Sequence, residues 1–182
     1  MSLYPLLTPL RRLGEPWVLA LSNQRRIGSF TLYTEAESGE GARIAAAVRD
    51  SLDLIERVDP VRFALVRRYA GRILIVRTRR QQYWPVSGVS VLSTQFVERA
   101  SAAYVAHVLI CHAVQGRLAR AGLYGNARVR ARAESLGIHA QIAFARRLPL
   151  DEWPNVTTLL ESLAQRLREL DGARADRRSP PG

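Results

Sequence analysis

Residues 101 to 118 form the least polar stretch of the chain, and their pattern predicts a buried helix. Apolar or small residues fill nearly every position from Ser101 to Val114, with no proline and no regular alternation of apolar and polar residues. A half-exposed strand would alternate, whereas a helix that is covered on most sides is apolar around its circumference. We therefore expect the rest of the fold to be organised around this helix.

Other segments repeat apolar residues at the three- and four-residue spacing of amphipathic helices. Proline suits the first turn of a helix, so Asp59-Pro60 marks the junction between two of them. Gly122 and Gly125 separate the central helix from the next one, which is expected to run antiparallel to it. The predicted buried face of that next helix consists of Val129, Ala133, Leu136, Ala140, Ala143 and Phe144. Helices are thus predicted over residues 42–58, 60–68, 126–147 and from about 152 or 156 to 170.

Runs rich in β-branched and aliphatic residues predict strands ahead of the central helix. Arg72–Thr78 and Val89–Thr94 are the clearest of these runs. The polar link Arg79–Gly88 between them contains Trp-Pro and is expected to be a long loop.

An N-terminal hairpin is predicted from two shorter apolar runs, Pro16–Ser22 and Ile27–Thr34, around a turn at Asn23-Gln-Arg-Arg. Strands and helices together predict an α+β fold. The last residues are rich in Arg, Asp, Ser and Pro, a composition typical of disorder. The chain is thus predicted to be one domain over residues 1–172, with the hairpin region over 1–35 and a disordered tail over 173–182.

Composition and charge narrow the function classes. The formal charge is +11, but all 27 basic residues are arginine and they are spread through every segment, so solvated surface is favoured over a nucleic-acid interface. Arginine-rich nucleic-acid binding is kept as an alternative. No segment reaches the roughly 20 apolar residues of a membrane span, and the first residues have the wrong order of charge and apolarity for a secretion signal. With one cysteine, which fits a reducing compartment, we expect a bacterial, cytoplasmic protein.

The central apolar helix carries a polar stripe. Residues four apart on a helix share a face, so His107, Cys111 and Gln115 are expected in one line, with His112 beside it. Buried polar groups need hydrogen-bond partners, so the stripe is expected to face other polar groups. These residues are the candidate functional site.

The segment Ala106-His-Val-Leu-Ile-Cys-His-Ala-Val-Gln-Gly-Arg-Leu118 resembles the zincin metallopeptidases, in which an apolar run leads into His-Glu-Ala-x-His and then a small residue, Arg and Leu. Arg132-Ala-Glu134 and Ile142-Ala-Phe-Ala-Arg-Arg-Leu-Pro149 are similar to the downstream helix of uncharacterised bacterial zincins of the glutamate-ligand type. The resemblance covers about residues 55 to 150. It implies a small zincin-like fold, with short strands and a buried central helix packed against an antiparallel helix and a C-terminal helix.

The resemblance also implies a site that lacks most of the residues needed for zinc-dependent hydrolysis. A zincin needs two imidazoles four residues apart on one zinc ion, a glutamate beside the first as general base, and an open position for water. Cys111 stands at the first histidine, His112 at the glutamate and Gln115 at the second histidine, while Glu134 matches the third ligand. The implied function is that of an inactive zincin-like domain that holds no metal or other cofactor and binds a protein or peptide through its former active-site groove.

Two rebuilt hydrolase sites are alternatives. His107, Cys111 and Glu134 supply three zinc ligands, and Cys111 with His107 or His112 supplies a thiol nucleophile and a base. A purely structural interpretation is the simplest. In it Cys111 fills core volume, the two histidines are hydrogen-bonded, and Gln115 and Glu134 satisfy one another or a nearby arginine such as Arg117. His139 lies off the apolar face of its helix and is expected to be exposed.

Overall fold

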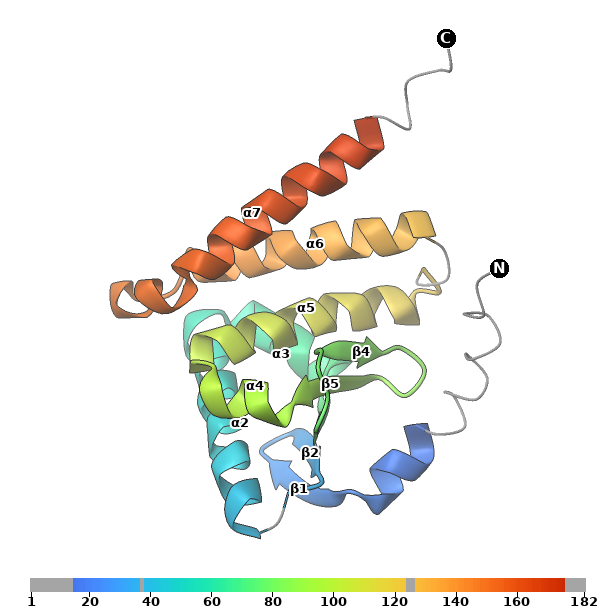
Figure 1. The fold of residues 1–182 in the computed structure, drawn as a ribbon, viewed down its shortest axis with the longest axis vertical. Coiled ribbons are helices and arrows are strands. Elements are labelled where there is room, and N and C mark those ends of the chain that lie inside the picture. The colour runs from blue at the N-terminus through green and yellow to red at the C-terminus, as the bar shows by residue number, and fades with distance from the viewer. Residues whose placement is uncertain (1–14, 37, 124–126, 176–182) are drawn as a thin grey trace.

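A computed structural model describes residues 15–36, 38–123 and 127–175, and it has the mixed α+β architecture expected from the sequence (Figure 1). The described residues contain one five-stranded sheet in the order β1-β2-β3-β5-β4. The central strands β2, β3 and β5 are parallel, and the two edge strands β1 and β4 pair antiparallel with their neighbours. The strands are β1 Asn23–Ile27, β2 Phe30–Thr34, β3 Arg72–Val76, β4 Gln82–Trp84 and β5 Val89–Ser93.

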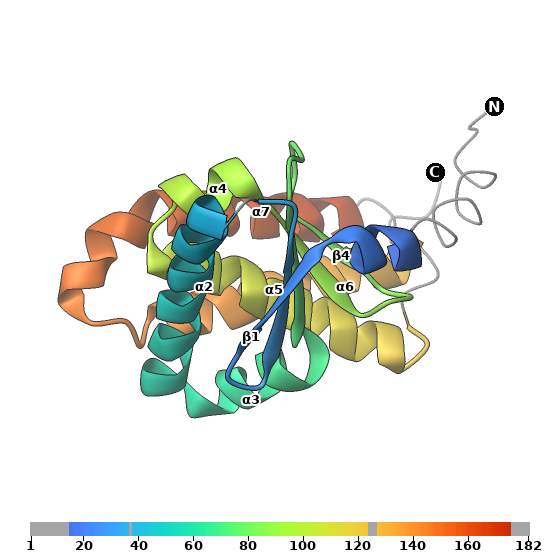
Figure 2. The same ribbon diagram turned by 90° about the horizontal axis from the view of Figure 1, so that it is seen from below.

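Helices cover both faces of the sheet and add further layers on one side. The helices with defined bounds are α2 Ser38–Val58, α3 Pro60–Tyr69, α4 Thr94–Arg99, α5 Ala102–Arg120, α6 Ala127–Ala145, the 3-10 turn η1 Leu150–Glu152, and α7 Trp153–Ala175. Residues 15–21 are also helical. Figure 2 shows α2 and this short N-terminal helix on opposite sides of the sheet. In Figure 1, α5, α6 and α7 follow one another outward from the sheet.

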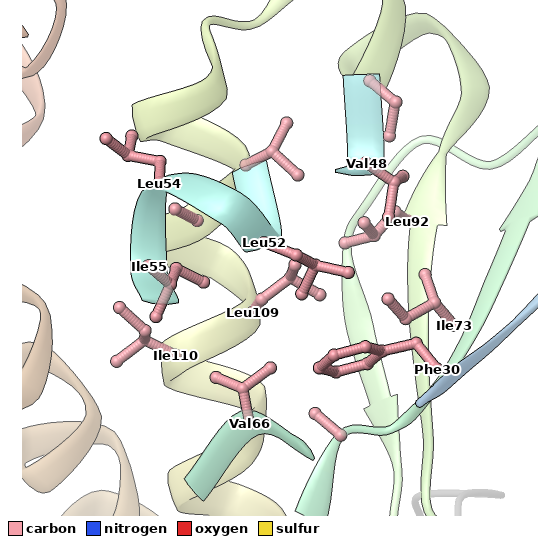
Figure 3. Packing of buried hydrophobic residues seen from close by; sticks show 14 of the residues in the cluster. Phe30, Val48, Leu52, Leu54, Ile55, Val66, Ile73, Leu92, Leu109 and Ile110 are labelled. Atoms are coloured by element: carbon pink, nitrogen blue, oxygen red, sulfur yellow. The ribbon is translucent and has the colours of Figure 1, made fainter. Parts of the chain in front are cut away.

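The main core lies between one face of the sheet and the helices α2, α3 and α5 (Figure 3). Phe30, Ile73 and Leu92 project from the strands into this core. Leu52 of α2 and Leu109 of α5 meet them from the helical side. Burial of such side chains stabilises each by about 1.5–3 kcal/mol relative to exposure, so this cluster fixes α5 against the sheet.

The junction between α2 and α3 is held by a buried carboxylate. Asp59 caps α3 by accepting a hydrogen bond from the Arg62 backbone N–H at 3.1 Å, and Pro60 occupies the first helical position. The Asp59 carboxylate is fully buried and pairs with the guanidinium groups of Arg62 and Arg147, the latter at 2.7 Å. These contacts tie the end of α6 to the start of α3.

The N-terminal hairpin was predicted with the wrong first arm. Residues 16–21 are helical, and Leu19 packs against Leu74 on the second face of the sheet. The predicted turn is instead strand β1, which pairs with β2 around Gly28, whose φ of 56° suits glycine. Short apolar runs do not distinguish helix from strand, and four of the five β1 residues are exposed, so its polar sequence carries no alternation.

Most of the predicted elements around the central helix are confirmed, with three corrections. The link Arg79–Gly88 contains strand β4, which is only three residues long and forms a hairpin with β5. Helix α7 does not end at Asp171-Gly172 but continues to Ala175. Leu136 is 43 % exposed rather than buried, because the buried face of α6 runs through Ala133, Ile138 and Phe144. The rest of the predicted tail, residues 176–182, lies outside the described part of the chain, as do residues 1–14 of the hairpin region.

Candidate functional site

Helix α5 carries the candidate residues between the sheet and α6. It begins after Ser101, whose hydroxyl accepts a hydrogen bond from the Tyr104 backbone N–H at 3.2 Å. Its polar stripe faces α6, which runs antiparallel to it: His107 lies against Phe144, and Cys111 lies opposite Gly137. The predicted polar stripe is therefore confirmed, and its residues differ in how completely α6 covers them.

Cys111, Gln115 and Glu134 line one cavity of about 410 Å³ between α5, α6 and α7. Three of the four positions that the zincin resemblance aligns with its motif, all except His112, are thus brought together. The remaining lining residues are Ala133, Ile138, Gln141, Leu163 and Arg166. The cavity combines apolar walls with a thiol, two carboxamides, a carboxylate and a guanidinium.

Glu134 is neutralised by an arginine from α7. Arg166 Nε donates to Glu134 Oε1 at 2.6 Å, and Arg166 Nη1 donates to Glu169 at 2.9 Å. The hydrogen bonds to Glu134 and Glu169 raise the pKa of Arg166 above its ordinary value, so the cation is permanent. Arg117, which we considered as a partner of Glu134, lies in a different groove. No sequence pattern pointed to Arg166, because it is 32 residues from Glu134 on the polar face of another helix.

Cys111 is a half-buried, protonated thiol. Its Sγ accepts a hydrogen bond from Gln115 Nε2 at 3.6 Å, and a Cβ on Gly137 would approach that sulfur to 2.9 Å. Burial, followed by the negative charge of Glu134, raises the pKa of Cys111 to about 11, although the Gln115 hydrogen bond opposes the rise. Because only the thiolate form is a good nucleophile, Cys111 is a poor nucleophile at neutral pH.

His107 is sealed inside the protein and does not line the cavity. Its ring lies edge-on to Phe144 at 5.2 Å between centroids, and the residue has no exposed surface. Neither ring nitrogen has a hydrogen-bond partner among the described residues, although Gln141 Nε2 donates to the His107 carbonyl at 3.1 Å. Burial lowers the pKa of His107 to about 4, so the imidazole is neutral. The expectation of a hydrogen-bonded histidine is wrong for this ring.

His112 faces the sheet edge rather than the cavity. Its ring lies 6.2 Å from that of Tyr83 on β4, and burial lowers the pKa of His112 to about 3. Its Nδ1 also has no partner in the described part of the chain. Tyr83 donates a hydrogen bond to the Tyr69 carbonyl at 3.1 Å and lies so close to Gly116 that a Cβ there would be 2.6 Å from the phenol oxygen. Tyr83 thus covers the side of α5 that carries His112.

Neither rebuilt hydrolase site is assembled. Among the residues that the structure describes, no three His, Cys, Asp or Glu side chains are grouped to hold a metal ion, so His107, Cys111 and Glu134 do not form the alternative zinc site. The structure records no thiol dyad in the described residues either: Cys111 is hydrogen-bonded to Gln115, and neither His107 ring nitrogen nor His112 Nδ1 has a partner there. His139 is exposed, as expected, with Nδ1 2.7 Å from the Ser135 carbonyl oxygen.

Comparison of the chain with protein families, curated proteins and solved structures finds no match. Within the described residues, no helix is both long enough and apolar enough to cross a membrane.

Proposed function

We propose that this chain is a catalytically inactive zincin-like domain that binds a peptide segment of another protein at the cavity between α5, α6 and α7. One observation carries the proposal: Cys111, Gln115 and Glu134 converge on one cavity, and the carboxylate there is paired with a guanidinium. A guanidinium has no acceptor or open coordination position with which to activate water. A binding role therefore fits this arrangement better than hydrolysis.

The chemistry of the other positions supports the same interpretation. A zincin general base must reach the water that attacks the substrate, whereas His112 is buried against Tyr83, and burial lowers the pKa of His112 to about 3, which makes it a weak base. Cys111 is protonated at neutral pH because burial raises its pKa to about 11. A single protonated thiol fits the reducing cytoplasm that we propose as the location.

The relation to zincins is tested by rebuilding the ligand set. Protein purified without a metal-affinity tag should contain no stoichiometric zinc. A variant with Cys111→His and Gln115→His should bind zinc in a competition titration once Arg166→Met frees Glu134, because two imidazoles and a carboxylate then surround the cavity. The same pair of histidine substitutions with Arg166 retained is the matched control and should bind more weakly. A folded triple variant that binds no zinc would contradict the zincin relation.

The binding role is tested separately by filling the cavity. Peptides selected from a displayed library on the wild-type protein should bind a Leu163→Trp variant at least about tenfold more weakly, because Leu163 lines the cavity. Leu150→Trp is the control, since Leu150 is 86 % exposed and lies outside the cavity. Peptides that bind both variants equally well, with both folded by circular dichroism, would place the binding site elsewhere.

A further inference from the structure

A second and larger groove lies on another side of α5. It has a volume of about 1020 Å³ and is bounded by α3, α5 and α6, with Leu167 of α7 at its margin. It shares no lining residue with the cavity that contains Cys111. Whatever binds in this groove is therefore independent of the function proposed above.

The floor of this groove is apolar and open to solvent. Leu65, Val114 and Leu118 are half-buried along it, while Val61 and Leu136 are 79 % and 43 % exposed. Exposed apolar side chains that gather beside a groove mark interaction sites more often than singly scattered ones do. Among the predicted α6 core residues from Ala133 to Phe144, Leu136 is the one that the fold leaves exposed.

The rim of the groove is basic. Arg62, Arg117, Arg146 and Arg147 line it, and none of the described lining residues is acidic. Arg62 and Arg147 share the single carboxylate of Asp59, while Arg117 and Arg146 form no ion pair with the described residues. Positive charge is thus in excess, and it is contributed by three different segments around the apolar floor.

We infer that this groove docks an acidic amphipathic helix of a partner protein. Amphipathic helices bind by laying apolar side chains at i, i+3, i+4 and i+7 into grooves of this kind, and flanking charges set the choice of partner. Cations spread around the rim match several carboxylates along a helix better than the one head group of a fatty acid.

Charge also argues against this chain as its own occupant. The whole chain has a formal charge of +11, so two copies repel one another. Residues 1–14 contain two arginines and no acidic residue, and residues 176–182 contain two arginines and one aspartate. Neither terminal sequence carries the negative charge that would complement the basic rim of the groove.

The inference is tested with a designed helical peptide of about 18 residues, above the length at which isolated helices are marginal. It carries leucine at the i, i+3, i+4 and i+7 positions and glutamate on the flanks. Fluorescence anisotropy should show that it binds the protein and that a version with lysine in place of glutamate does not. Binding should weaken as salt rises from about 50 to about 200 mM, because exposed charge pairs are screened.

Two groove variants and two matched controls locate the binding. Leu136→Glu and Arg146→Glu should each weaken peptide binding by about tenfold, since one charges the apolar flank and the other reverses the rim. Leu21→Glu and Arg25→Glu change an 85 % exposed leucine and an exposed edge-strand arginine, both outside the groove, and should change binding by less than about twofold. Equal losses in groove and control variants would show charge attraction alone and overturn the inference.

Two other ligands serve as competing probes. Double-stranded DNA and vesicles of phosphatidylglycerol both carry dense negative charge without the apolar stripe of the peptide. If either binds with the same dependence on Leu136 and Arg146 while the peptide does not, the groove serves a different partner and the inference fails. Loss of peptide binding in the groove variants together with unchanged DNA and vesicle binding supports the acidic helix.

Discussion

Two parts of helix α5 are covered by aromatic side chains and a third part borders an open cavity. This difference explains which of its polar residues are available for binding. At one end of its contact with α6, Phe144 covers His107, and toward the sheet Tyr83 covers His112 and Gly116. At the other end, Cys111 and Gln115 reach a cavity that also holds Glu134 and Arg166. The two imidazoles are therefore structural, while the residues at the open end keep polar neighbours and access.

The sealed end should be the most sensitive to truncation. Phe144→Ala removes a fully buried ring and is expected to lower the free energy of unfolding by about 3–5 kcal/mol, since the transfer and cavity terms add. Denaturant unfolding measures this loss. Leu136→Ala on the same helix is the control and should cost far less, because Leu136 is 43 % exposed. Similar losses in both variants would contradict the assignment of the buried face of α6.

Acid should destabilise the protein through the buried imidazoles. The pKa of His107 is lowered from 6.5 to about 4, so the unfolded state binds its proton first as the pH falls. Stability present above pH 6.5 is then lost at about 1.4 kcal/mol per pH unit until the folded pKa is reached, on the order of 3 kcal/mol for this group. His112 adds a loss of the same sign that extends to about pH 3.

Denaturant melts between pH 7 and pH 4 measure this acid effect. A His107→Leu variant should lose less stability over that range than the wild-type protein, while His139→Gln, which changes an exposed histidine, should keep the full dependence. A His107→Leu variant with an unchanged pH dependence would show that His107 binds its proton equally well in the folded and unfolded states.

The contact between Gly116 of α5 and Tyr83 of β4 should leave no room for a larger residue at position 116. Gly116→Ala places a Cβ 2.6 Å from both the Tyr69 carbonyl oxygen and the Tyr83 hydroxyl, and is expected to cost about 1–3 kcal/mol of folding stability. Gly39→Ala in α2 is the matched control, because nothing lies within 4 Å of its new Cβ. Thermal melts compare the two, and a Gly116→Ala variant as stable as the control would mean that both Tyr83 and the Tyr69 carbonyl move easily away from α5.

The open end should show the smallest effect. Glu134 and Arg166 have side chains that are 41 % and 50 % exposed, so Glu134→Ala should lower the free energy of unfolding by only about 0.2–1 kcal/mol. Denaturant unfolding at low and high salt measures this change. A loss above about 2 kcal/mol would show that Glu134 is a buried structural group. In that case the cavity would not be open for a ligand.

Helical periodicity predicted which residues share a face of α5, and the structure confirms that His107, Cys111 and Gln115 all face α6. Periodicity could not predict how that face is covered. The covering groups are Phe144, Tyr83 and Arg166. They lie between 29 and 55 residues along the chain from the α5 residues that they cover, and Tyr83 is on a strand too short to recognise from the sequence.

The fold class followed from the apolar patterns because the long helices repeat apolar residues at helical spacing and strands β3 and β5 are rich in aliphatic residues. The errors lie where burial is weak. Strand β1 is exposed along four of its five residues, and Leu136 belongs to an apolar stripe that is wider than the surface α6 buries. The apolar pattern of α6 therefore predicted only core positions, although part of it lines an open groove.

The two margins of the sheet have a consequence for the behaviour of the protein at high concentration. A strand margin with unpaired backbone groups can recruit a strand from another molecule and start an aggregate. One margin, β1, displays Arg25 and Arg26, and the other, β4, offers only the three residues Gln82–Trp84. Charge repulsion at the first and brevity at the second should keep molecules from joining their sheets, even when they are crowded together.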